Sequence, residues 1–354
     1  MNRRFLLACV AAALGLVLAG ACGSAPTAAP SPPPVTVRVG YLLADLHHIA
    51  YVVGQDAEAG GGTSFYDQYG VRVEDAAGAP YANGGVEMDH FAAGDVDLGM
   101  LGAPPAITKH LNAAVDIRII AQVNALGSAL VVGPNVQTPQ DLLGQTVAVP
   151  GHAAIQFFLF LNFAQQNGLD IGEITIVDMP PPDMRVKLES GEIAGFLAWE
   201  PWPADAISSG AGEVMATSSD IWPGHLDCVV AVDRAFAESQ PDTVRRFLQA
   251  HIAATRWIQE ALAQPGSEPY AHLMDLGASF TQRPRAVVEA AFSNITFRSA
   301  LDSGFNDSIK AYTEKLIEFG LIPPEKLTER GYTSVDDFVA RYVDPSFIQA
   351  IPNP

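Results

Sequence analysis

The sequence predicts an α/β fold built from short buried strands that alternate with helices. Apolar segments such as residues 35–43, 96–101 and 145–150 have strand-like character, and stretches with helical periodicity follow them. Alternation of this kind is typical of sheets with mainly parallel pairing. After residue 232 the chain is largely helical. We therefore expect mainly parallel sheets and a helical C-terminal extension.

A repeated sequence pattern indicates two lobes of similar build. Residues 94–105 run from the end of a helix through an acidic residue into a short apolar strand, and a Pro-Pro pair then opens the next helix. Residues 191–201 repeat this order and close on a proline. Ligands of open α/β sheets bind beyond the carboxyl ends of the strands. Each repeat is therefore expected to offer one strand-end loop to a shared cleft.

The start of a second strand–helix series sets the expected domain boundaries. We predict a first lobe of residues 35–123 plus 229–354, and a second lobe of residues 127–225. The helical tail is expected to pack back on the first lobe. The chain then crosses between the lobes near 124–127 and near 221–228, and two such crossings form a hinge.

The N-terminal segment is predicted to be a targeting signal. Residues 1–21 combine two early arginines with an apolar stretch that is shorter than the ~20 residues a membrane span needs. Cys22 follows in a sequence that resembles a bacterial lipoprotein box, and residues 22–34 form a Gly/Ser/Ala/Pro tether. Simple cleavage after Ala21 is the alternative. We expect an exported protein that is held on the outer face of the cell membrane by a lipid on Cys22.

Composition excludes several classes of protein. A hydrophobic content of 49% with 17% charged residues indicates a globular chain. A formal net charge of −19 makes nucleic acid and anionic lipid poor partners. The three cysteines do not form a disulfide framework, because Cys9 leaves with the signal, Cys22 is predicted to be acylated, and Cys228 then stands alone.

The end of the first strand carries three candidate ligand contacts. Asp45, His47 and His48 lie where this strand passes into the next helix. Either they face the solute, or Asp45 caps the helix and the histidines lie on its surface. Neighbouring residues of a helix point in different directions, so at most one of the two histidines is expected to contact the solute.

Helix starts and chain crossings supply further candidates. A helix is expected to begin directly at Gly151-His152-Ala153, where free N–H groups favour an anionic group. The loop at Gly102 and Ala103 offers a similar, smaller nest. Neutral hydrogen bonds are expected from the crossings. The full set of candidate ligand contacts is Asp45, His47, His48, Gly102, Ala103, Asn124, Ser128, Gly151, His152, Ala153, Trp199, Glu200 and His225.

The second repeat ends on an aromatic and an acidic side chain. Trp199 is expected to stack on a flat or cationic solute, and Glu200 to accept from an amine. The alternative is that Trp199 packs in the core and Glu200 caps the following helix. Arginine and lysine are not obvious at these loops, and Asp45 with Glu200 opposes a fully anionic ligand. This balance favours a zwitterionic or amine-bearing heterocyclic solute over bare nitrate, so the expected solute is a small polar organic molecule such as a sulfonate, a taurine-like compound or a heterocyclic amine.

Five short motifs lie at residues 39–42, 94–99, 139–150, 187–194 and 199–201. Together they resemble a known family, the extracytoplasmic solute-binding proteins of ABC importers in the nitrate/sulfonate/taurine class. The resemblance implies a two-lobe periplasmic-binding-protein fold of type II that closes on a small solute and delivers it to the transmembrane permease subunits. We expect a monomer with no cofactor.

Two alternative functions remain open. A transition-metal or metal-chelate receptor would use His47, His48, His225 and Cys228, although no close Cys or His pairs match a structural zinc pattern. An enzyme is the other alternative, because some proteins of this fold carry out synthase chemistry on pyrimidine precursors. The sequence lacks the nucleophile-elbow, P-loop and zinc-protease motifs, and catalysis is not expected.

Overall fold

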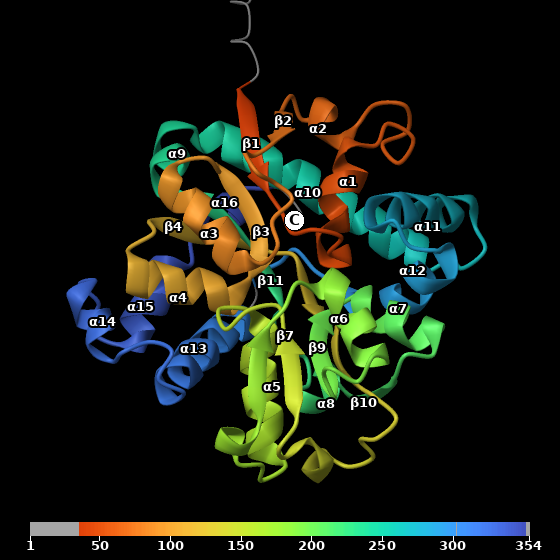
Figure 1. Cartoon of the computed structure of the whole chain (residues 1–354). Helices are drawn as coiled ribbons and strands as arrows, with labels where there is room; N and C mark the ends of the chain where they lie inside the picture. Colours follow the sequence, from red (N-terminus) through yellow and green to blue (C-terminus); the bar gives the residue numbers. More distant parts are fainter. Residues whose placement is uncertain (1–34, 302, 352–354) are drawn as a thin grey trace, which may run out of the picture. The chain divides into compact units, whose positions relative to one another are not determined.

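The computed structural model describes residues 35–301 and 303–351, without the side chain of Ser303 (Figure 1). The predicted signal peptide, the predicted lipidation site Cys22 and the predicted tether all lie outside the described residues. None of the helices in the described ranges has the length and apolarity needed to cross a membrane.

The first five-stranded sheet has the order β2-β1-β3-β11-β4. Strand β1 (Thr36–Gly40) is parallel to both β2 (Arg72–Asp75) and β3 (Leu98–Gly102). Strand β11 (Cys228–Asp233) runs antiparallel between β3 and β4 (Ile117–Gln122).

The second sheet has the order β10-β6-β9-β7-β8 and repeats the first one strand by strand. Strand β7 (Thr146–Val149) is parallel to β8 (Thr175–Asp178) and β9 (Gly195–Trp199), as β1 is to β2 and β3. Strand β6 (Ser128–Val132) runs antiparallel between β9 and β10 (Glu213–Thr217), as β11 does in the first sheet. The repeated sequence pattern therefore lies on β3 and β9, which hold equivalent places.

The same local device begins each repeat. Gly94 follows helix α3 (Gly84–Ala93) with a φ of 77°, and Gly191 follows α6 (Pro181–Glu189) with a φ of 72°. Glycine enters this left-handed region without the steric cost of a Cβ, so it ends a helix cleanly.

The expectation of mainly parallel pairing is wrong, because both sheets are mixed. Strands β6 and β11 follow a crossing between the sheets, so each enters its sheet from the crossing side. Each therefore runs against its neighbours. Sequence alternation does not reveal this direction, since a buried strand has the same composition either way.

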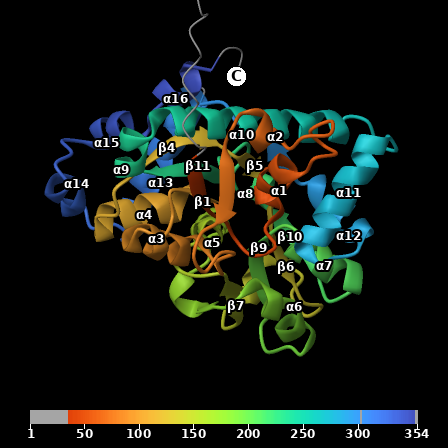
Figure 2. The same cartoon turned by 90° about the horizontal axis from the view of Figure 1, so that it is seen from above.

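The helices cover both sheets (Figures 1 and 2). In chain order they are α1 (Ile49–Gln55), α2 (Phe65–Gln68), α3, α4 (Ala103–Ala113), α5 (Ile155–Gln166), α6, α7 (Trp202–Ser209), α8 (Ser218–Ile221), α9 (Arg234–Ser239), α10 (Pro241–Leu262), α11 (Glu268–Thr281), α12 (Arg285–Phe292), α13 (Ser303–Glu318), α14 (Glu325–Glu329), α15 (Val335–Tyr342) and α16 (Ser346–Gln349). The long helix α10 buries Phe247 and Leu248 in one apolar cluster with Val39 of β1 and Val230 of β11.

The two crossings lie side by side. Strand β5 (Asn124–Leu126) pairs with β12 (Ile295–Phe297) in a two-stranded antiparallel sheet. Ala125 also forms a bridge with Leu226 of the second crossing. Paired crossings of this kind concentrate bending at a few residues, as the predicted hinge requires.

The helical tail contacts the helices of both sheets, not only those of the first. Tyr312 of α13 packs against Phe158 of α5, with ring centroids 4.9 Å apart. Asn294, just after α12, donates to Glu200 beside α7. An apolar helix face does not show from its sequence which lobe it covers.

One expected helix start is corrected, and the one at the Pro-Pro pair is confirmed. Helix α5 begins at Ile155, after a turn closed by Ala154 N–H donating to the carbonyl of Gly151, and not at Gly151 to Ala153. Helix α4 begins at Ala103, with Gly102 as its N-cap and both prolines in its first turn.

Candidate functional site

A small cavity lies where the carboxyl ends of β1, β3 and β9 approach the start of α5. Its volume is about 10 Å³, measured as the space open to the centre of a water molecule, so it holds about one water. A molecule larger than water therefore fits only if the cavity walls move apart. The cavity is lined by Leu42, Asp45, Gly84, Gly102, Pro105, Ala154, Ile155, Gln156, Trp199, Asp227 and Cys228.

The start of α5 provides the positive end of the cavity. Ala154 caps this helix without a side-chain hydrogen bond, and Ala154, Ile155 and Gln156 all line the cavity. The first N–H groups of a 12-residue helix and its dipole favour a negatively charged group there. The anion site expected at Gly151–Ala153 thus moves along the chain to the true helix start.

The start of α4 does not provide a comparable nest. The N–H of Ala103 already donates to the carbonyl of Asp227 at 2.9 Å. Pro104 and Pro105 have no N–H to offer. Gly102 and Pro105 therefore contribute shape to the cavity and not donors.

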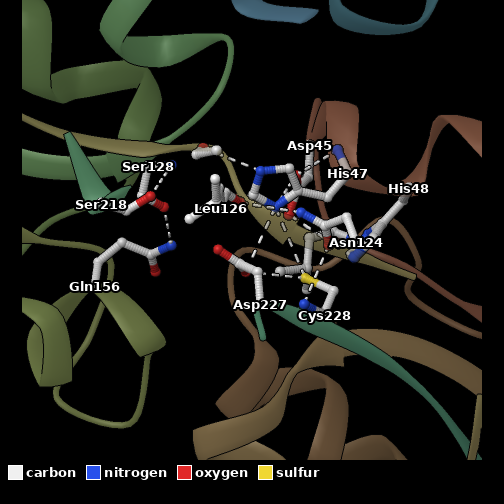
Figure 3. Close-up of polar contacts among 12 residues, drawn as sticks. Asp45, His47, His48, Asn124, Leu126, Ser128, Gln156, Ser218, Asp227 and Cys228 are labelled. Atoms are coloured by element: carbon white, nitrogen blue, oxygen red, sulfur yellow. Dashed lines mark hydrogen bonds and ion pairs between the residues drawn. The ribbon is translucent and has the colours of Figure 1, made fainter. Parts of the chain in front are cut away.

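The opposite wall of the cavity is acidic (Figure 3). Asp45 follows β1, and Asp227 directly precedes β11; both are fully buried. The Nδ1 atom of His47 lies 3.3 Å from Asp45 Oδ1 and 3.6 Å from Asp227 Oδ1. The thiol of Cys228 contacts Asp227 Oδ1 at 3.4 Å. Asp227 Oδ2 has no hydrogen-bond partner among the described residues.

Burial governs the protonation of this wall. Desolvation raises the pKa of Asp227 to about 7, and it raises the pKa of Asp45 well above its usual value, with Asp227 adding to the effect. Desolvation lowers the pKa of His47 to about 3, so the imidazole is neutral at physiological pH. The wall is therefore poised to take up a positive group that replaces its protons.

Neutral donors complete the cavity. Trp199 lines it, and the indole Nε1–H is buried without a partner among the residues that the structure describes. Gln156 donates to the hydroxyl of Ser128 at 3.0 Å, while Ser128 N–H donates to Ser218. Ser128 thus orients Gln156, and Gln156 meets the cavity.

Three of the predicted contacts meet at the cavity, namely Asp45, Gly102 and Trp199. His47 lies directly behind Asp45. The other predicted positions are His48, Ala103, Asn124, Ser128, Gly151, His152, Ala153, Glu200 and His225, and these do not line the cavity.

The predicted positions away from the cavity have structural partners. His48 Nδ1 accepts from the N–H of Leu42, and Asn124 Oδ1 accepts from the N–H of Cys228. His225 Nδ1 lies 2.8 Å from the carbonyl of Leu226. His152 pairs with Asp178 on the surface. Glu200 caps α7 through the N–H of Ala204 and accepts from Asn294.

Sequence reasoning missed Asp227, Gln156 and Glu87. Asp227 is adjacent to Cys228, which the sequence offered as a metal ligand. Gln156 lies within the first turn of α5, close to the helix start that the sequence predicted. Glu87 gave no signal, because one acidic residue in the first turn of α3 is typical of a surface helix. It is nevertheless fully buried, and burial raises its pKa.

A sequence model of the NMT1-like family matches residues 31–268. The chain belongs to the NMT1-like family. This confirms the family resemblance seen in the motifs.

Individual proteins with similar sequences support the same family assignment. The taurine-binding periplasmic protein of Escherichia coli K12 is 30% identical over 167 residues, which cover 46% of this chain and 51% of that protein. The chain spans about half the length, or less, of the curated relatives that it matches.

Solved structures confirm the periplasmic-binding-protein fold. The periplasmic nitrate-binding protein NrtA from Synechocystis PCC 6803 superimposes with a TM-score of 0.72 at 17% identity, covering 91% of this chain and 90% of that one. The alkanesulfonate-binding protein SsuA from Xanthomonas axonopodis pv. citri, bound to MOPS, gives a TM-score of 0.70 at 16% identity, covering 89% and 99%.

The buried Glu200 of this NMT1-like protein predicts a pH dependence of stability. Desolvation raises its pKa from the usual 4.5 to about 7, against the hydrogen bonds from Asn294 and Ala204. Between these values the folded state holds a proton that the unfolded state has lost. The contribution of Glu200 to stability therefore falls as pH rises from about 4.5 to about 7, by up to about 3 kcal/mol.

Denaturant unfolding across this pH range measures the effect. Glu200→Gln retains both bonds if the Asn294 amide rotates, so we expect it to flatten the decline in stability. Glu213→Gln changes an exposed carboxyl and serves as the control. Equal pH slopes for wild type and Glu200→Gln would contradict the prediction.

Proposed function

We propose that this protein is the solute receptor of an ABC importer and that its solute is a small zwitterion of the taurine type. The observation that carries the proposal is the polarity of the cavity. One wall holds Asp45 and Asp227, and the other holds the start of α5 with the indole N–H of Trp199. Opposite charges on one small molecule match these two walls.

The acidic wall is suited to an ammonium group. A bound ammonium replaces the protons on Asp45 and Asp227 and stabilises their ionised forms. A bare anion such as nitrate would meet these carboxyls without compensation. The wall thus favours an amine-bearing solute over nitrate.

The α5 end is suited to a sulfonate or carboxylate. The free N–H groups of the first turn of this helix and Trp199 Nε1 donate to anionic oxygens, and such charge-assisted bonds are stronger than neutral ones. Leu42, Pro105 and Ile155 supply apolar contact for a short carbon chain between the two charges.

The relatives support a receptor role. One is described as a taurine-binding periplasmic protein, and a structural neighbour as an alkanesulfonate-binding protein. The partners proposed here are the permease subunits of the importer. We also propose that the protein is exported, that a lipid on Cys22 anchors it to the membrane, and that it is a monomer.

The alternative functions find less support. A metal receptor using all four predicted residues would need His48 and His225 beside His47 and Cys228. Yet among the described residues the group of donor atoms that lie within 4.8 Å of one another comprises Asp45, His47 and Cys228, and it includes neither His48 nor His225. Catalysis by Cys228 would need a thiolate, and burial beside Asp227 raises the pKa of this thiol well above its usual value. We therefore propose a receptor without catalysis of its own.

A thermal-shift and calorimetry series tests the solute. Taurine at 100 times its Kd is expected to stabilise the protein by about 2.7 kcal/mol. Ethanesulfonate lacks the amine and ethylamine lacks the sulfonate, so both are expected to bind much more weakly. Equal responses to taurine, ethanesulfonate and nitrate would refute the proposal that one wall binds the amine and the other the sulfonate. No response to any of them would count against a receptor role.

A conservative variant isolates the indole donor. Trp199→Phe keeps an aromatic ring but removes the N–H, and loss of one hydrogen bond to a charged group predicts about 10- to 100-fold weaker taurine binding. Trp257→Phe, on α10 beside His272, is the matched control and should bind taurine as the wild type does. Unchanged affinity in Trp199→Phe would remove this residue from the site.

A further inference from the structure

We propose that Asp45, His47, Asp227 and Cys228 form a binding site for one divalent transition metal ion of the zinc type. Three of these residues, Asp45, Asp227 and Cys228, line the cavity, and His47 lies directly behind Asp45. All four side chains are buried. The set differs from the metal ligands expected from the sequence, because two carboxylates take the places of His48 and His225.

The donor atoms have the spacing of a mononuclear site. Around His47 Nδ1 lie Asp45 Oδ1 at 3.3 Å, Asp227 Oδ1 at 3.6 Å and Cys228 Sγ at 3.8 Å. Cys228 Sγ and Asp227 Oδ1 are 3.4 Å apart. Ligands held at 2.0–2.3 Å around a tetrahedral zinc ion are separated from each other by roughly 3.3–3.8 Å. Asp45, His47 and Cys228 each offer a donor atom within 4.8 Å of the other two, and Asp227 lies beside His47 and Cys228. One ion can therefore reach the first three donors, with Asp227 next to it.

The orientation of His47 fits a metal ligand. Its Nε2 lies 3.0 Å from the carbonyl oxygen of Gly127, which can only accept. Nε2 therefore carries the proton, and the lone pair of Nδ1 faces Asp45, Asp227 and Cys228 (Figure 3). A histidine fixed by a backbone carbonyl through its second nitrogen is the usual support of a metal-binding imidazole.

A second observation separates this cluster from an ordinary buried polar group. Asp227 has no exposed surface, and its Oδ2 lacks a hydrogen-bond partner among the described residues. The ion-pair partners of Asp45 are His47 and His48, and that of Asp227 is His47. Two buried carboxyls and a thiol around one neutral imidazole are costly to ionise unless a cation joins them.

The chemical class of the ion follows from the donors. One thiolate, one imidazole and two carboxylates suit zinc, and cobalt(II) is its usual spectroscopic substitute. Because the cavity lies against three of the ligands, a bound ion would face the proposed solute. This part of the inference rests on the proposed function: the amine of the solute would meet a bound ion in its unprotonated form, whereas in the metal-free protein it meets the carboxyls as an ammonium.

Titration of the metal-free full chain with cobalt(II) tests the site. We expect one equivalent to bind with the intense visible bands of a tetrahedral ion and the ultraviolet band of a cobalt–thiolate bond, and zinc to displace it. Cys228→Ser should lose the thiolate band and bind at least about 100-fold more weakly, since loss of supporting residues alone costs 10–100-fold. His152→Ala removes an exposed histidine and should leave both unchanged.

If Cys228→Ser does not fold, Asp227→Asn serves as the second variant, because it keeps the shape of the side chain. It should weaken cobalt binding by a similar factor. Absence of saturable uptake by the wild type would overturn the inference, as would an unchanged spectrum and affinity in a folded Cys228→Ser or Asp227→Asn protein. The taurine response is recorded on the same metal-free wild-type protein. Failure of metal uptake and failure of solute capture are therefore distinguished.

Discussion

Gly127→Ala is expected to lower the free energy of unfolding by about 2–5 kcal/mol, because it adds backbone strain and a steric clash at one position. Gly127 has a φ of 94°, where a Cβ is disfavoured. A Cβ there would overlap His47 Nε2 and would lie 2.9 Å from Ile295 Cγ1. Both neighbours are buried, so neither can move aside cheaply.

Chemical denaturation of Gly127→Ala and Gly144→Ala measures the two costs separately. Gly144 also has a positive φ, of 75°, but its Cβ would have no heavy atom within 4 Å. The control therefore carries strain alone, and the difference between the variants reports the clash with His47 and Ile295. Equal destabilisation of both variants would show that the hinge accommodates the extra methyl group.

Gly99→Ala is expected to destabilise the protein by about 3 kcal/mol, near the upper end for overpacking of a rigid core. The missing Cβ of Gly99 makes room for the carboxyl group of Glu87, and an added methyl would overlap Oε1. It would also lie 2.7 Å from Phe91 Cε2. At Gly99 the groups that approach the backbone are therefore buried side chains of α3.

Gly102→Ala is the matched control on the same strand. Its added Cβ would meet Pro105 at 3.4 Å, an ordinary contact, so its free energy of unfolding should stay within about 1 kcal/mol of the wild type. Adding Glu87→Ala to Gly99→Ala should recover part of the loss, because one of the two clashes disappears. Additive effects in this pair would refute the proposed contact.

Much of the fold was readable from local patterns. The repeat at residues 94–105 and 191–201 correctly indicated two sheets of similar build, because strand composition and helix-ending glycines are local properties. The antiparallel direction of β6 and β11 was not readable, since it depends on where the chain re-enters each sheet after crossing. The contacts of α13 with both lobes depend likewise on packing between segments far apart in the sequence.

The candidate site was readable only in part. Asp45, Gly102 and Trp199 meet at the cavity as expected from their places at strand ends. Glu200 and His225 follow or precede strands in the same way, yet their polar atoms bond to Ala204, Asn294 and Leu226. Position at a strand end places a residue near a cleft, but side-chain direction decides whether it meets the ligand.

The sequence by itself determined the alternation of strands and helices, the repeat and the family, because each is written in local composition and motif. Tertiary structure alone decided that Asp227 and Cys228, at the start of β11, join Asp45 and His47, which follow β1. It also decided that Glu87 is buried against Gly99. The physical reason is that the burial and partners of a polar side chain arise only when distant segments pack together.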